Sequence, residues 1–143
     1  MTVEILRESS DEVLAAFGRL LPQLSSSAEA LDHESLTRLL RSDTTTVLVA
    51  RVDGRIAGTL TLCAVPLPTG MRARIEDVVV DEEARGRGVA AALVSRAVEL
   101  AREAGARTVD LTSRPAREAA NRLYQRAGFH PRDSVVYRLD LRS

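Results

Sequence analysis

Apolar and polar residues alternate along the middle of the chain in the pattern of neighbouring strands. Residues 45–52 form a strand-like segment, and Asp53-Gly54 directly after it is a strong signal for a two-residue hairpin. A second strand is predicted over residues 56–65. After a turn rich in proline and glycine, a third strand is predicted over residues 73–80. These three strands are expected to form an antiparallel meander.

The amino-terminal part mixes one short strand with two helices. Alternation begins at Val3 and predicts a first strand, and residues 9–11 then offer helix N-caps. The helix that follows is expected to end near Pro22, and a second short helix is predicted over residues 33–40. These helices could border a substrate cleft, or they could only pack on the sheet.

A change of period from two to between three and four residues predicts a long amphipathic helix from about Gly88 to Ala104. A further strand is predicted over residues 108–112. A strand, a helix and a strand in that order imply a parallel crossover, so the sheet is expected to be mixed. The apolar face of the helix carries Val89, Leu93, Ala97, Leu100 and Ala104.

The carboxy-terminal part is predicted to hold one more helix and one more strand. Pro115 suits the first turn of the helix, and Gly128 suits the position just after its end. Alternation from Val135 to Leu141 predicts a last strand with one buried face. Together these elements predict a mixed α/β (α+β) fold, a mostly antiparallel sheet with one parallel crossover and flanking helices, in one domain over residues 1–143.

Composition narrows the choice of partners and of chemistry. The chain has 20 basic and 20 acidic residues, so its formal charge is zero and no broad attraction to nucleic acid or membranes is expected. Residues 1–43 carry a balance of −4, which suits either a cationic substrate or ordinary solvated surface. Every basic residue is arginine, which rules out chemistry based on a lysine amine. A single cysteine, Cys63, and the lack of a signal peptide or long apolar run predict a cytoplasmic protein.

Residues 85–88, Arg-Gly-Arg-Gly, stand between the strand that ends at Val80 and the long helix. The first N–H groups of a helix lack partners within it and carry the positive end of its dipole, so they favour phosphate. Glycine lets a ligand approach the backbone closely, and arginine adds charge and planar hydrogen-bond donors. This pattern predicts a phosphate-binding cradle.

Two nucleotide-binding motifs are alternative interpretations of this predicted cradle. Residues 86–91 match the dinucleotide pattern G-x-G-x-x-G/A, and Asp110 lies at nearly the spacing of a ribose-binding acid. However, residues 81–85 separate the strand from the first glycine, and the chain after Asp110 is too short for the second half of a doubly wound sheet. A nucleoside-triphosphate P-loop would need a lysine.

The better match is R-x-x-G-x-A over residues 85–90. With Ile75-Glu76-Asp77-Val78-Val79-Val80 upstream and Leu123-Tyr124-Gln125-Arg126-Ala127-Gly128-Phe129 downstream, the chain resembles the GCN5-related N-acetyltransferase (GNAT) family. The resemblance covers residues 45–143 well and implies a GNAT-like fold that binds the pyrophosphate of acetyl-CoA. The implied cradle residues are Arg85, Gly86, Arg87, Gly88, Val89 and Ala90.

The resemblance also implies catalytic roles. Glu76 is expected to act as the base toward the acceptor amine, directly or through water, and Tyr124 as the acid toward the departing thiolate. Asp77 is the alternative base, although regular alternation would point it to the opposite side from Glu76. Backbone groups of Val78 and Val80 are expected to bind the thioester carbonyl and the pantetheine arm.

One position departs from the family pattern. An asparagine often stands seven residues before the tyrosine, where this chain has Arg117. Asn121 lies four residues further on and could share the same helical face, so either it replaces that cofactor contact or the contact is absent.

The sequence therefore predicts an N-acetyltransferase that moves acetyl from acetyl-CoA to a primary amine by direct attack. The alternative is a catalytically inactive acyl-CoA sensor or protein-interaction module. The acceptor is expected to be a small-molecule amine or a protein N-terminus, and the protein a monomer or a homodimer. His33 and His130 stand isolated in the sequence, so no metal is expected.

Overall fold

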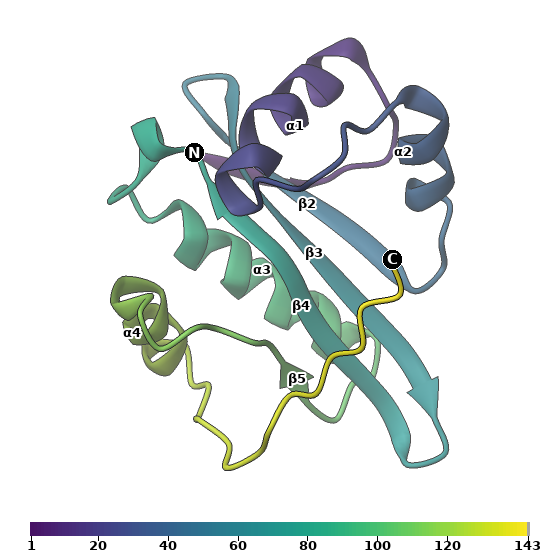
Figure 1. Cartoon of the computed structure of the whole chain (residues 1–143), viewed down its shortest axis with the longest axis vertical. Coiled ribbons are helices and arrows are strands. Elements are labelled where there is room, and N and C mark those ends of the chain that lie inside the picture. Colours follow the sequence, from purple (N-terminus) through teal and green to yellow (C-terminus); the bar gives the residue numbers. More distant parts are fainter. Residues whose placement is uncertain (143) are drawn as a thin grey trace. The chain divides into compact units, whose positions relative to one another are not determined.

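The computed structural model describes residues 1–142 and contains a five-stranded sheet in the order β1-β2-β3-β4-β5 (Figure 1). Neighbouring strands are antiparallel except β4 and β5, which are parallel, so the predicted mixed α/β sheet is confirmed. The elements are β1 (Thr2–Ile5), α1 (Asp11–Leu24), α2 (His33–Leu40), β2 (Thr45–Val52), β3 (Arg55–Leu67), β4 (Gly70–Val80), the 3-10 turn η1 (Glu82–Ala84), α3 (Val89–Glu103), β5 (Val109–Asp110) and α4 (Glu118–Arg126).

The chain divides into two compact units. The first, residues 1–112, holds the whole sheet and helices α1 to α3, and the second begins at Ser113 and holds α4. Among the residues that the structure describes, no helix is long and apolar enough to cross a membrane.

Within the first unit, the predicted hairpin is confirmed by its backbone. Asp53 and Gly54 have φ of 52° and 79°, and positive φ at both central residues is what a two-residue type I′ turn requires. Strand β2 covers the predicted residues, and helix α2 begins after Asp32, whose side chain accepts a hydrogen bond from the Ser35 N–H. Local sequence therefore determines these boundaries.

Two layers of helix cover the sheet. Helices α1 and α2 lie on one face and α3 on the other (Figure 1). Leu20 and Leu36 have no exposed surface and pack with Val47 and Val49 of β2. Full burial of one such leucine contributes about 1.5–3 kcal/mol. On the opposite face, a Cβ on Gly58 would lie only 3.0 Å from Val89 of α3, so the small residue permits close helix packing.

Several predicted helix or strand boundaries change. Strand β3 runs on to Leu67 and β4 begins at Gly70, so the predicted turn between them is shorter. Helix α1 continues through Pro22 to Leu24, because a proline in the last turn removes little of the hydrogen-bond ladder. Pro115 lies in a turn before α4, which begins at Glu118. Strand β5 is shorter than predicted, because only Val109 and Asp110 pair with β4.

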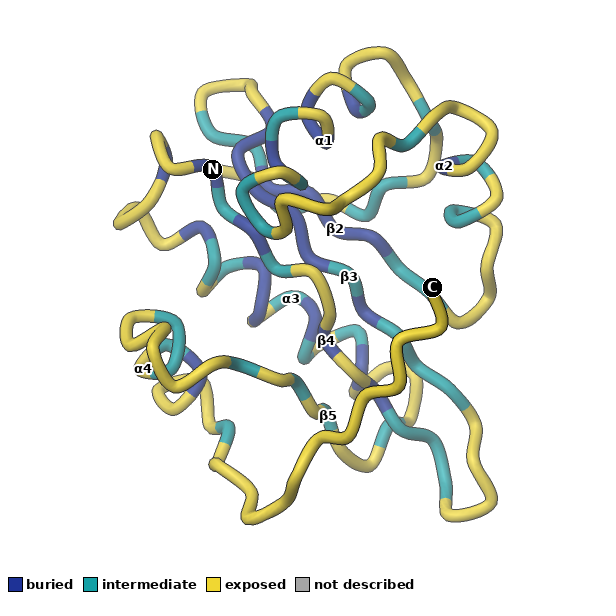
Figure 2. Tube along the Cα trace, in the orientation of Figure 1, coloured by how far each residue is buried: buried dark blue, intermediate teal, exposed yellow. Residues whose placement is uncertain are grey.

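The predicted last strand is wrong. Residues 134–142 form no strand, and the large apolar side chains meant for its buried face are exposed, with Tyr137 at 91% (Figure 2). Alternation predicts a strand only where a neighbouring strand supplies the ladder hydrogen bonds. The described sheet consists of β1 to β5, and residues 134–142 are not among its strands. The exposed residues are Val135, Val136, Tyr137, Leu139 and Leu141.

Candidate functional site

Strand β4 is irregular at the residues predicted to be catalytic. Glu76 lies opposite Thr61 of β3, whereas Val79 lies opposite Thr59. Three steps along β4 therefore match two steps along β3, which is the signature of a β-bulge with one extra residue. The regular alternation that would separate the side chains of Glu76 and Asp77 does not hold here.

Asp77 carries the strained backbone of this bulge. Its φ is 50°, in the left-handed region, where a residue other than glycine costs about 1–2 kcal/mol. Partial desolvation of the carboxyl and the neighbouring charge of Glu76 raise the pKa of Asp77, although the residue as a whole is exposed. Within the first unit, residues 1–112, the side chain of Asp77 has no hydrogen bond or ion pair.

Glu76, the predicted base, is already paired. Its Oε1 lies 2.9 Å from Nε of Arg74, and Nη2 of Arg74 also donates to Oγ1 of Thr112 at 3.2 Å. Both members of the ion pair are about half exposed, so the pair is worth at most about 1 kcal/mol of stability. The positively charged guanidinium of Arg74 nevertheless lies in direct contact with the Glu76 carboxylate.

Within the first unit, the outer edge of β4 is open beside these residues. Strand β5 pairs with β4 only at Ala73 and Arg74, so the ladder on that side stops before Glu76. The Asp81 N–H donates to the Ala57 carbonyl of β3, and because alternate residues face opposite edges, the N–H of Val80 faces the open edge. An extended ligand chain can hydrogen-bond to such an edge as an added strand does.

The predicted cradle follows at the end of this edge. Gly86 and Gly88 both have φ of 79°, and nothing lies within 4 Å of the place where a Cβ would stand on either. Gly88 is the N-cap of the 15-residue helix α3, and no side chain caps its first N–H groups. The helix start is therefore an open, positively polarised site for an anion, and Val89 and Ala90 belong to its first turn.

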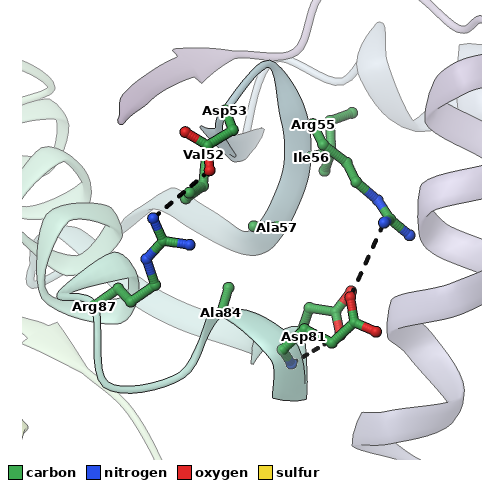
Figure 3. A pocket seen from close by; sticks show the side chains of 9 residues that line it. Val52, Asp53, Arg55, Ile56, Ala57, Asp81, Ala84 and Arg87 are labelled. Carbon is green, nitrogen blue, oxygen red and sulfur yellow. Dashed lines mark hydrogen bonds and ion pairs between the residues drawn. The ribbon is translucent and has the colours of Figure 1, made fainter.

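The two arginines of the cradle have different surroundings. Nε of Arg85 donates to the Val80 carbonyl at 3.4 Å. Arg87 reaches toward Asp53 of the β2–β3 hairpin, with Nη2 and Oδ2 3.7 Å apart (Figure 3). Both partners of the Arg87 pair are largely exposed, so this weak pair leaves Arg87 free to turn toward a phosphate.

Next to the cradle, between the hairpin and η1, lies a pocket of about 230 Å³. Two pairs of opposite charge flank it, Arg87 with Asp53 and Arg55 with Glu83, the latter at 4.0 Å (Figure 3). Because its charges are already matched, the pocket favours no particular ligand charge. It is lined by Val52, Asp53, Arg55, Ile56, Ala57, Asp81, Glu83, Ala84 and Arg87.

Helix α1 holds the segment that leads into the cradle, a role that sequence reasoning missed. Nε of Arg19 lies 3.1 Å from Oδ2 of the buried Asp81, and its Nη2 donates to the Ile56 carbonyl at 2.7 Å. Oε1 of Gln23 accepts from the N–H of Glu82 at 3.1 Å. Burial opposes ionisation of Asp81, but hydrogen bonds from the Glu83 N–H and Arg19 hold the pKa of its carboxyl below the ordinary value.

The remaining predicted residues lie in the second unit, on α4. Tyr124 is buried, and its ring meets Phe129 edge to face with centroids 6.1 Å apart. Burial raises the pKa of the Tyr124 phenol, with Arg117 opposing the shift, so the phenol holds its proton at neutral pH. Gly128, at φ of 101°, ends the helix as predicted, and the Phe129 N–H donates to the Tyr124 carbonyl.

The Asn121 side chain already makes hydrogen bonds within this unit. Its Nδ2 donates to the carbonyl of Arg114 at 3.0 Å and lies 3.4 Å from that of Pro115. These bonds tie the helix to the turn before it. The cofactor contact proposed for Asn121 remains a prediction.

His33 is not isolated. Its Nδ1 lies 2.6 Å from Oγ of Ser9 and its Nε2 2.9 Å from Oδ1 of Asp11. The group is exposed and ties the start of α2 to the start of α1. No group of three or more metal-binding side chains occurs among residues 1–142.

Known proteins share parts of this sequence. A stretch of 63 residues, 44% of the chain, is 36% identical to 28% of an uncharacterized N-acetyltransferase of Methanocaldococcus jannaschii. A stretch of 60 residues, 42% of the chain, is 45% identical to 34% of a probable glucosamine 6-phosphate N-acetyltransferase of Oryza sativa subsp. japonica. The aligned part therefore spans about a third or less of either relative.

The fold is shared over a greater length. A putative acetyltransferase of Agrobacterium tumefaciens superposes with a TM-score of 0.85 at 25% identity, over 98% of this chain and all of that one. The sequence model of the acetyltransferase (GNAT) family matches residues 10–129, which include the bulge in β4, the cradle and α4. The chain belongs to the acetyltransferase (GNAT) family.

Proposed function

We propose that this protein is an acetyl-CoA-dependent N-acetyltransferase that acetylates a primary amine by direct attack. The observation that carries the proposal is the continuity of two features in the first unit. The open edge of β4 leads directly to the uncapped start of α3, where both glycines have positive φ. An extended arm that ends in a pyrophosphate suits this combination.

The residues present fit such a donor. The N–H groups at the start of α3, together with Arg85 and Arg87, would hold the pyrophosphate. The backbone of Val78 would hold the thioester carbonyl, and the backbone of Val80 would hold the pantetheine arm. When bound, acetyl-CoA supplies an acetyl group activated as a thioester.

For this reaction the chain must supply a proton acceptor, a hydrogen-bond donor to the carbonyl oxygen and a proton donor to the sulfur. The amine nitrogen forms a bond to the acetyl carbon while the carbon–sulfur bond breaks, so CoA leaves as a thiol. A carboxylate of the Glu76–Asp77 pair accepts the proton that the amine loses. The Val78 N–H donates to the carbonyl oxygen as negative charge develops, and Tyr124 gives its proton to the departing sulfur.

The acceptor is proposed to be a small-molecule amine or a protein N-terminus. The Oryza relative is named for glucosamine 6-phosphate, which makes an amino-sugar phosphate one reasonable test compound. The other compounds in the test would be an aminoglycoside, spermidine and a peptide that begins with alanine.

A second candidate is an acyl-CoA sensor without catalysis. The ion pair between Arg74 and Glu76 favours it, because an acceptor amine would have to displace the guanidinium to reach this carboxylate oxygen. The enzyme and the sensor are both expected to bind CoA, but only the enzyme transfers the acetyl group.

Two measurements on the purified protein distinguish them. Calorimetry with CoA tests the donor site, and release of free thiol from acetyl-CoA with each of the four amines tests transfer. The enzyme is expected to bind CoA and to release thiol with at least one amine. Binding without release from any amine would support the sensor, and failure of both would overturn both candidates.

A further inference from the structure

The two neighbouring carboxylates on β4 are not equivalent, and the difference bears on which one acts as the base. The inference rests on the proposed transfer to an amine. Glu76 is held by Arg74 at 2.9 Å, so an N–H of the incoming neutral amine must compete with a guanidinium for the same oxygen. Asp77 has no hydrogen bond or ion pair within the first unit, residues 1–112.

The strained backbone conformation of Asp77 also supports a functional role for this residue. Strain at a residue other than glycine persists only where the surrounding structure imposes it, and such strain gathers at functional sites. Here the pairing of β3 with β4 imposes the strain. Thr61 pairs with Glu76 and Thr59 pairs with Val79, so the chain between Glu76 and Val79 must hold one extra residue. The extra residue is thereby placed directly before Val78, whose N–H is proposed to meet the thioester carbonyl.

We propose that Asp77 is the catalytic base that accepts the proton of the acceptor amine, and that Glu76, fixed by Arg74, is its negatively charged neighbour. The nitrogen loses its proton to a carboxylate oxygen of Asp77 as the carbon–nitrogen bond forms, because the nitrogen becomes more acidic at that moment. After the products leave, Asp77 gives its proton to water and Tyr124 takes one from water, which restores both groups. No further reactant is required.

The electrostatics of the site support this assignment. Asp77 is exposed, but desolvation of its carboxyl and the charge of Glu76 raise its pKa, which brings its basicity closer to neutral pH. Arg74 is the cation paired with Glu76, and it offsets part of the repulsion between the two carboxylates. A base with a raised pKa and no competing partner suits proton transfer better than a paired one.

Asp77→Asn is the decisive variant, because asparagine keeps the shape and tolerates positive φ while it removes the charge. Glu76→Gln is the matched control one residue away. With the most active of the four test amines, Asp77→Asn is expected to lower kcat by about 100-fold or more and to abolish the acidic limb of the pH profile. Glu76→Gln is expected to keep that limb and to lose less than about tenfold.

Three further measurements keep the test decisive. Thermal unfolding and calorimetric CoA affinity of both variants should match the wild type, which would exclude a folding or donor-binding defect. Carbon-13 NMR of the wild-type carboxylates in the CoA complex should show Asp77 titrating above an ordinary aspartate. An active wild type whose acidic limb survives in Asp77→Asn would overturn the assignment alone, whereas an inactive wild type would overturn the transferase proposal on which it rests.

Discussion

Arg19 of α1 and Asp81, the residue between β4 and η1, form an ion pair 3.1 Å long beneath the segment that leads into the cradle. Arg19 also binds the Ile56 carbonyl of β3, so one side chain joins a helix, a strand and this segment. Asp81 is buried, and loss of its partner would leave a poorly solvated charge. The first prediction follows from this contact.

Arg19→Gln is expected to lower the free energy of unfolding by about 1–3 kcal/mol at neutral pH, measured by urea unfolding. Arg96→Gln is the control, because its pair with Glu99 lies on the surface of α3 and is worth less than about 1 kcal/mol. Equal losses in the two variants would contradict the importance given to the Asp81 contact.

The same pair predicts a dependence on pH. The pKa of Asp81 is depressed in the folded state, so its contribution is present above the ordinary aspartate pKa and is lost as the pH falls through the folded value. The difference in stability between wild type and Arg19→Gln should therefore shrink in acid. Urea unfolding at neutral pH and below pH about 4 would measure it, and a difference that stays constant would argue against the pair.

Gly88→Ala is expected to weaken CoA binding by at least about tenfold, because the ligand must approach the backbone of the cradle closely. Gly105→Ala is the matched control just beyond the other end of α3, since Gly105 has φ of 80° and nothing lies within 4 Å of the place that a methyl group would take. Both changes should cost about 1 kcal/mol of stability through backbone strain. Calorimetry with CoA measures the loss of affinity apart from the loss of stability. An equal loss of CoA affinity in both variants would contradict the role of Gly88 in binding CoA.

Tyr124→Phe is expected to slow turnover by about 100-fold while CoA affinity changes less than about twofold, because only the proton of the phenol is removed. The ring would still pack edge to face on Phe129, so stability at neutral pH should change little. Steady-state kinetics and calorimetry on the same preparation provide the measurement. Unchanged turnover would remove Tyr124 from the chemistry.

The raised pKa of Tyr124 also predicts behaviour in alkali. A folded pKa above the unfolded value gives stability that is present below the unfolded pKa, about 10, and lost as the pH rises through the folded value. The wild type should therefore lose more stability than Tyr124→Phe above pH about 10. Parallel losses in the two proteins would show that the phenol is not desolvated.

Local sequence predicted the parts of the fold that local interactions determine. The Asp53-Gly54 turn needs positive φ at two adjacent residues, and few other dipeptides supply it. Helix α3 lies one residue inside its predicted ends, because Gly88 and the apolar period mark it together. The cradle was found for the same reason, since its glycines and the helix start are contiguous.

Features that depend on distant partners were not predicted. The bulge at Asp77 arises from the register between β3 and β4, and nothing in residues 75–80 alone shows an extra residue. The contact between Arg19 and Asp81 joins residues 62 apart, and Arg19 looks like any polar position of an amphipathic helix. The alternating residues 135–141 failed as a strand because alternation carries no information about a partner.

The central claim is direct transfer of acetyl from acetyl-CoA to an amine. The most direct test is to incubate the protein with acetyl-CoA and the four amines, then to quantify free CoA, acetylated amine and the intact protein mass by mass spectrometry. Direct transfer should give equal amounts of CoA and acetylated amine, with the protein mass unchanged throughout. No acetylated amine from any of the four, or an acetylated protein that passes its acetyl group to the amine, would contradict it.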